Sequence, residues 1–129
     1  MKTLRLDGGA VHDIPSFYDE VNRVFMVGVD WTLGPSLDAL DDLLYGGYGA
    51  IDGDEPVRVV LGDDRRLRAA LGVEETRRHH RAKLARPEGF DVALIEARLR
   101  DLDAGTGPTY YETVREILAA HPNIVVVED

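Results

Sequence analysis

In segment 37–45, apolar and polar positions separate onto two sides of a helix. A helix advances about 100° per residue, so residues of this segment fall on two sides. One side holds Leu37, Leu40, Leu43 and Leu44, and the other side holds Asp38, Asp41, Asp42 and Tyr45. Ser36 is a suitable N-cap, and Gly46 and Gly47 end the helix. The pattern predicts a short helix that packs its leucines in the core and displays carboxylates outward.

Strands and helices alternate along the rest of the chain. Period-two alternation predicts a strand at 3–7, and β-branched residues predict strands at 57–61 and 124–127. Helical periodicity predicts helices at 15–26, 64–71, 74–86, 91–104 and from 109 onward, with Asp13, and Thr109 together with Glu112, as N-terminal caps. Because segment 124–127 lacks alternation, we expect a strand buried on both faces at the centre of a parallel sheet. The order predicts an α/β fold in which helices pack a small parallel sheet.

Composition limits the classes of function. A chain of 129 residues is expected to form a single domain spanning 1–129, and the absence of cysteine excludes disulfides and thiolate metal sites. A net charge of −9 argues against nucleic-acid binding, because affinity for phosphates comes from Lys and Arg. The sequence lacks a signal-like start and an apolar stretch long enough for a membrane span. We therefore expect a soluble, cytoplasmic protein that binds no membrane.

The negative charge is concentrated around the acidic helix. Between Arg23 and Arg58 there is no Lys, Arg or His, and the acidic residues are Asp30, Asp38, Asp41, Asp42, Asp52, Asp54 and Glu55. A patch of one sign attracts a basic partner and repels nucleic acid. An ordinary solvated helix face is the alternative interpretation. Trp31, the only tryptophan, lies just before the helix and is either a core residue or an interface anchor.

Two further clusters of charged residues are candidate sites. Helix 74–86 carries the one basic run, which could bind phosphate or pair with carboxylates of the same protein. His79 and His80 are adjacent and point about 100° apart on a helix, which is poor geometry for chelation. The acidic turn 52–55 lacks the spacing of an EF-hand. Neither cluster predicts a metal or a cofactor.

Three motifs occur in a fixed order along the chain: Leu6-Asp7-Gly8; Gly34 followed by Leu37-Asp38-Ala39-Leu40 and Asp42; and Val114-Arg115-Glu116 before the last strand. Together they resemble the barstar family of intracellular ribonuclease inhibitors. The resemblance implies a barstar-like three-stranded parallel sheet packed by helices, with residues 73–108 as a helical insertion before the last helix. It also implies an inhibitor of the immunity or antitoxin type, which blocks a ribonuclease active site with an acidic helix and the preceding loop as mimics of RNA phosphates.

The resemblance assigns roles to individual residues. Asp42 matches the principal aspartate that enters the phosphate pocket, Asp38 matches a second contact carboxylate, and Glu116 matches the glutamate of the last helix. The predicted partner-binding residues are Trp31, Ser36, Asp38, Asp41, Asp42, Tyr45 and Glu116. The partner is a basic ribonuclease, and the free protein is expected to be monomeric. The insertion 73–108 is expected to be peripheral to binding.

The motifs also depart from the family pattern. Trp31-Thr32-Leu33 stands where the family has paired tyrosines, Ser36 replaces an asparagine, and Asp41 and Gly47 replace tryptophans. With these differences, the expected target is either a ribonuclease like the family's usual one or another toxin nuclease.

Two other functions fit the acidic helix. A non-inhibitory adaptor would use the same face on a different basic protein. A metal-dependent phosphoryl-transfer enzyme would gather Mg²⁺ with the four carboxylates Asp38, Asp41, Asp42 and Glu116. An enzyme of that kind needs a concave pocket and a general base, which a convex acidic helix face lacks. The expectation from sequence is therefore a binding protein and not an enzyme.

Overall fold

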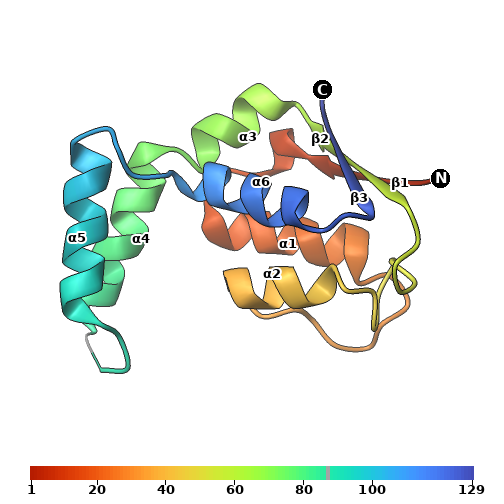
Figure 1. The fold of residues 1–129 in the computed structure, drawn as a ribbon, viewed down its shortest axis with the longest axis horizontal. Helices are drawn as coiled ribbons and strands as arrows, with labels where there is room; N and C mark the ends of the chain where they lie inside the picture. The colour runs from red at the N-terminus through yellow and green to blue at the C-terminus, as the bar shows by residue number, and fades with distance from the viewer. Residues whose placement is uncertain (87) are drawn as a thin grey trace.

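The computed structural model describes residues 1–86 and 88–129 (Figure 1). In chain order, the elements are β1 (Lys2–Asp7), the 3-10 helix η1 (Gly8–Ala10), α1 (Ile14–Phe25), α2 (Leu37–Leu43), β2 (Val57–Gly62), α3 (Asp64–Ala70), α4 (Val73–Ala85), α5 (Val92–Asp103), α6 (Tyr110–Ala120) and β3 (Ile124–Glu128). Residue 87, which falls in the predicted insertion, lies outside the described residues. The order of strands and helices confirms the predicted α/β class.

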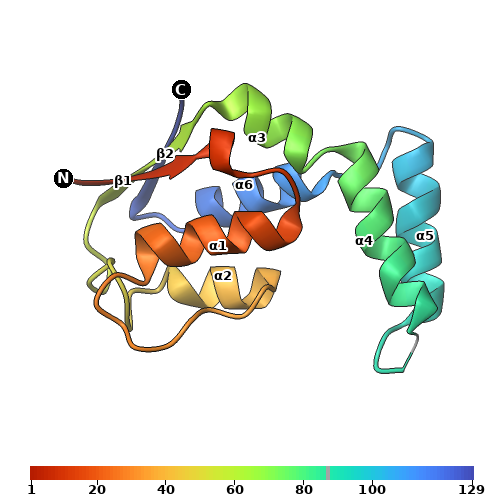
Figure 2. The same cartoon turned by 180° about the vertical axis from the view of Figure 1, so that it is seen from behind.

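The sheet is parallel and has three strands in the order β1-β2-β3. Leu6 of β1 lies beside Leu61 of β2, and both are almost fully buried on the sheet face that α1 and α6 cover. Figures 1 and 2 show α2 on the side of α1 and α6 that faces away from the sheet. This arrangement lets α2 bury its leucines against α1 and α6 while its other side faces outward.

The expectation that segment 124–127 forms a central strand buried on both faces is wrong. β2 is the central strand, β3 lies at an edge, and Val125 of β3 is 45% exposed. The outward side chains Arg5 and Arg58 of the other strands are also exposed, so helices protect only one face of this sheet. A run of β-branched residues shows that a strand forms, but it does not show which strand is central.

The predicted helix caps are confirmed. Asp13 Oδ1 accepts a 2.8 Å hydrogen bond from Ser16 N, and Thr109 and Glu112 form a reciprocal capping box at the start of α6. Ser36 Oγ accepts from Ala39 N at 3.1 Å. Each cap satisfies one of the backbone N–H groups that the first turn of a helix leaves without a partner, so short polar side chains fix where these helices begin.

Helices α4 and α5 pack against each other and project beyond the layer of α1, α2 and α6 (Figure 2). The first turns of α4 are nevertheless joined to the rest of the molecule. Thr76, which is 2% exposed, accepts a hydrogen bond on Oγ1 from Tyr110 N at 2.8 Å. Glu75 Oε2 accepts from Ile14 N at 2.7 Å. The start of the predicted insertion is therefore part of the core, and only its distal part projects.

Candidate functional site: the acidic face of α2

The leucines of α2 hold the helix in place. Leu40, Leu43 and Leu44 are at most 2% exposed, while Asp38 and Asp42 on the other side are exposed. The helix ends before Gly46, which has a φ of +78°. A Cβ at this position would lie 2.3 Å from the carbonyl oxygen of Gly53, so the tight turn requires glycine. The amphipathic pattern therefore gives the helix, and two of its three aspartates face outward as expected.

Asp41 lies at the edge of this face and has a partner within the protein. Its Oδ1 is 2.7 Å from Nε2 of His121, a residue that is only 6% exposed. The ring of Tyr45 meets the His121 ring edge to face, with centroids 4.7 Å apart. Because the imidazole binds one carboxylate oxygen, Asp41 is less available to an external cation than its position on the helix suggested.

Asp42 lies beside an aromatic pair. The Tyr48 hydroxyl donates to Asp42 Oδ2 at 3.0 Å, and the Tyr48 ring packs against Trp31 with centroids 4.9 Å apart. Burial and the neighbouring carboxylate raise the pKa of Tyr48, so its hydroxyl stays protonated and remains a donor. Trp31 is 48% exposed, which makes it a surface residue rather than a core residue. The three side chains form one contiguous surface of indole, phenol and carboxylate.

The loop that carries Trp31 is anchored from α1. The side chain of Asn22 accepts from Leu33 N at 2.6 Å and donates to Leu33 O at 3.3 Å. Leu33 is buried at 6% exposure and packs into the core. This double hydrogen bond fixes the loop a few residues after Trp31, so the indole has a defined place next to α2.

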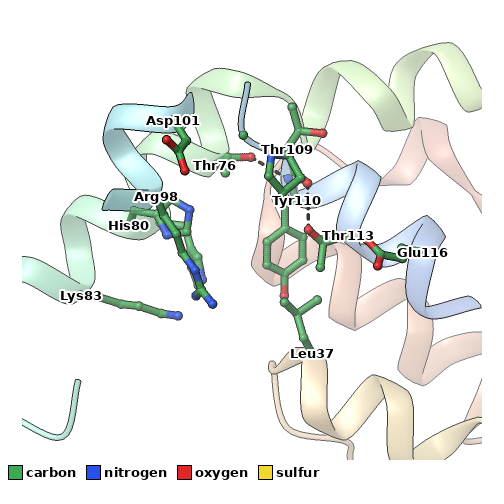
Figure 3. A pocket seen from close by; sticks show the side chains of 13 residues that line it. Leu37, Thr76, His80, Lys83, Arg98, Asp101, Thr109, Tyr110, Thr113 and Glu116 are labelled. Carbon is green, nitrogen blue, oxygen red and sulfur yellow. Dashed lines mark hydrogen bonds between the residues drawn. The ribbon is translucent and has the colours of Figure 1, made fainter. Parts of the chain in front are cut away.

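Glu116 reaches the same region from α6. It is exposed, and it lines a cleft together with Leu37 from the start of α2 (Figure 3). Direct packing of α2 on α6 brings these residues near each other although they are far apart in sequence. Ser36 is exposed as well, but its hydroxyl is already used as the N-cap.

The surface charge of segment 24–57 is less uniform than the sequence implies. Glu55 pairs with Lys2 at 2.8 Å, and Asp41 pairs with His121. The acidic residues of the segment that are exposed are Asp30, Asp38, Asp42, Asp52 and Asp54. These carboxylates still give the molecule a negative face, because the sequence between Arg23 and Arg58 contains no Lys, Arg or His.

Within the part of the chain that the structure describes, no group of three or more His, Cys, Asp or Glu side chains is arranged to hold a metal ion. Asp38, Asp41, Asp42 and Glu116 are therefore not gathered into a set of ligands for Mg²⁺. Among the described helices, none combines the length and apolar character that crossing a bilayer requires.

Three residues of this region escaped the sequence analysis: Asn22, Tyr48 and His121. His121 lies 80 residues from Asp41 in the sequence. The only sequence feature that points to a role for His121 is its place between the last helix and Pro122. Tyr48 lies next to the Gly-rich turn, where an aromatic side chain is an unusual choice and hints at a packing role. Asn22 is one polar residue of an amphipathic helix. Its position in the sequence does not distinguish it from a polar residue that only contacts solvent.

Comparison of the chain with protein-family models, with curated proteins and with solved structures gives no match in any of the three. The parallel sheet and its helices are therefore known from the structure alone, and the function is inferred from the residues of the candidate site.

Proposed function

We propose that this protein inhibits a basic ribonuclease by inserting the outward face of α2 and the Trp31 loop into the active site of the enzyme. The observation that carries the proposal is the exposed pair Asp38 and Asp42 on a firmly packed helix, with Trp31 and Tyr48 beside it. The resemblance of the motifs around this helix to the barstar family supports the same function.

The chemistry of the proposed target favours such a surface. A ribonuclease must gather cationic side chains to hold phosphate and to stabilise charge in the transition state. Carboxylates presented at the same place compete for these cations through charge-assisted hydrogen bonds. Inhibition by this mechanism needs no metal and no chemical step in the inhibitor.

The aromatic pair makes Asp42 the central contact. One oxygen of Asp42 accepts from Tyr48, which restricts the side-chain rotamer and leaves the second oxygen available to a partner. Large aromatic side chains next to a charged contact exclude water and are typical of residues that dominate binding energy. We therefore assign the main contact to Asp42 with Trp31, and a supporting contact to Asp38.

The adaptor remains a second candidate, because the same negative face would bind any basic protein of matching shape. The two functions are separated by an assay of RNA cleavage: an inhibitor abolishes the activity of its bound ribonuclease, and an adaptor leaves it intact. Calorimetric titration with Mg²⁺ tests the metal-dependent enzyme, for which the described carboxylates offer no assembled site.

The direct test uses the ribonuclease recovered with the protein from its own cells. Asp42→Ala should weaken binding by about 2 to 5 kcal/mol, because it leaves cations of the enzyme buried without a counter-charge. Asp52→Ala is the matched control: Asp52 is an exposed carboxylate on the turn after α2, and its loss should cost under about 1 kcal/mol. Equal affinity of Asp42→Ala and the wild type, with both proteins folded in a thermal melt, would refute the assigned role of α2.

A further inference from the structure

A cleft of about 310 Å³ lies between the projecting helices and the body of the molecule. Helices α4 and α5 supply one wall, and α6 with the start of α2 supplies the other (Figure 3). This volume falls at the lower end of the range for small-molecule sites. The floor includes Tyr110, which is 4% exposed and meets the ring of His79 edge to face.

Two cations extend into this cleft. Figure 3 shows Lys83 from α4 and Arg98 from α5 pointing into the same space. In the part of the chain that the structure describes, neither cation has a carboxylate within ion-pair distance, whereas Arg77 and Arg78 of α4 both have acidic partners. Burial, followed by the charge of Arg98, lowers the pKa of Lys83. Two like charges facing one cleft without a counter-ion are unfavourable for the fold alone and leave room for an external anion.

His80 adds an unsatisfied polar group to the same wall. Its Nδ1 is buried and has no hydrogen-bond partner among residues 1–86 and 88–129. Burial and the neighbouring cations Lys83 and Arg98 lower the pKa of the ring, so His80 is neutral near pH 7. An anion bound next to Lys83 and Arg98 would offset the part of this effect that comes from the two cations.

Two carboxylates limit what the cleft accepts. Asp101 on α5 and Glu116 on α6 also line it, and Figure 3 places them away from the tip of Lys83. They would repel a ligand that is anionic throughout. They are suited to hydrogen-bond donors, such as the amino or hydroxyl groups of a ligand body.

We propose that this cleft binds a small phosphomonoester, with its phosphate at Lys83 and Arg98 and an amino or hydroxyl group toward Asp101 and Glu116. The cleft adjoins the candidate site through Leu37 and Glu116 but does not include Asp38 or Asp42 of the outward face of α2, and the inference does not depend on ribonuclease inhibition. Of the two roles that the basic run of helix 74–86 left open, phosphate binding is thereby assigned to Lys83, while Arg77 and Arg78 pair with carboxylates of the same protein.

The test titrates the purified protein with inorganic phosphate and with phosphoethanolamine, using calorimetry and NMR of the isotopically labelled chain. Both should bind saturably, with phosphoethanolamine the tighter of the two, and shifts should concentrate at His80, Tyr110 and Thr113. The double variant Lys83→Gln with Arg98→Gln should lose about tenfold or more in affinity, since it removes two charge-assisted hydrogen bonds. Arg81→Gln with Arg86→Gln is the control, because it removes the same charge from exposed positions outside the cleft.

Absence of saturable binding, or binding that the control variant weakens as much as the double variant, would overturn the proposal. Equal affinity for the two probes would overturn the role of Asp101 and Glu116. A thermal melt of each variant shows whether it is folded. Should the double variant unfold, Arg98→Gln alone replaces it, because Arg98 is exposed and its loss relieves repulsion of Lys83.

Discussion

Asp38, Asp41 and Asp42 lie within two turns of α2 but differ in what their carboxylates contact. Asp38 is exposed, Asp41 binds the buried ring of His121, and Asp42 accepts from Tyr48 while remaining exposed. An exposed carboxylate that accepts a hydrogen bond from one neighbouring side chain is held in a defined orientation and still presents its negative charge to a partner. This combination singles out Asp42 among residues of identical chemistry.

Gly46 gives a prediction at the same scale, because the turn after α2 depends on it. Gly46→Ala should destabilise the protein by roughly 1 to 2 kcal/mol from the positive φ alone, and by more because the new Cβ meets the Gly53 backbone at 2.3 Å. Gly47→Ala is the matched control, since its Cβ would have no atom within 4 Å and its φ is not positive. Urea denaturation followed by circular dichroism measures both, and equal midpoints for the two variants would contradict this account of the turn.

Local residue chemistry was predictable, and distant pairing was not. The caps at Asp13, Ser36 and Thr109 could be predicted because each acts on a backbone N–H within three residues. The bond between Asp41 and His121 joins residues 80 positions apart, and periodicity contains no information about it. Helical spacing placed Asp41 on the outward face, but only packing of α2 beside the end of α6 shows that its carboxylate is partly occupied.

At the scale of elements, α4 has two parts with different roles. Its first turns bond to α6 and to the start of α1, and its last turns line the cleft through His80 and Lys83. Deleting the whole of segment 74–106 would therefore remove core contacts together with the projecting part. A shorter deletion that keeps the first turns of α4 is the better test of whether the projection contributes to ribonuclease binding.

Thr76→Val tests the attachment of α4. The variant keeps the shape of the side chain but removes the acceptor of Tyr110 N, and a buried unsatisfied N–H costs about 1 to 3 kcal/mol. Thr76→Ser keeps the hydroxyl and should cost less. Chemical denaturation of both variants measures the difference. A larger loss of free energy of unfolding in Thr76→Ser than in Thr76→Val would show that the methyl group, and not the hydrogen bond, holds α4 to α6.

His79 gives α4 a dependence on pH. Burial, followed by the charge of Lys83, lowers the pKa of His79 to about 4 from a usual value of 6.5. The unfolded chain therefore takes up a proton before the folded protein does, and the free energy of unfolding falls as pH decreases from 6.5 to about 4. Below this window, His79 contributes no further change.

The check is His79→Phe, which keeps a ring against Tyr110 but cannot titrate. Its free energy of unfolding, measured by denaturation at a series of pH values, should fall less steeply than that of the wild type across the window. His12→Phe serves as control, because the side chain of His12 is 79% exposed. An unchanged slope in His79→Phe would show that other groups produce the acid sensitivity.

The sheet shows where element prediction reaches its limit. All three strands were found from local pattern, yet the position of β3 at the edge follows from the order in which strands pair. An uninterrupted apolar run at 124–127 fits a central strand and an edge strand equally well when one sheet face carries no helices. Strand order depends on long-range contacts, and no motif in the chain encodes it.

At the scale of the whole molecule, charge is distributed unevenly. The acidic segment around α2 contains no cation in sequence, whereas Lys83 and Arg98, which have no acidic partner among residues 1–86 and 88–129, lie in the cleft of the projecting helices. A molecule of this kind has a field that orients an approaching partner before contact. The proposed basic partner would be drawn to the α2 side and turned away from the cations.

Association kinetics test this orientation. Because the Debye length shortens from about 30 Å at 0.01 M salt to about 3 Å at 1 M, the rate of association with the proposed ribonuclease should fall at least roughly tenfold over this range, while the dissociation rate changes less. Asp38→Asn should reduce the slope of that dependence, because it removes an exposed charge from the α2 face. Glu96→Gln on α5 is the control of equal charge change, and Glu96 is also exposed. The association rates are measured by stopped flow across the salt series. An association rate that is independent of salt, or an equal change of slope in the two variants, would contradict steering by the α2 face.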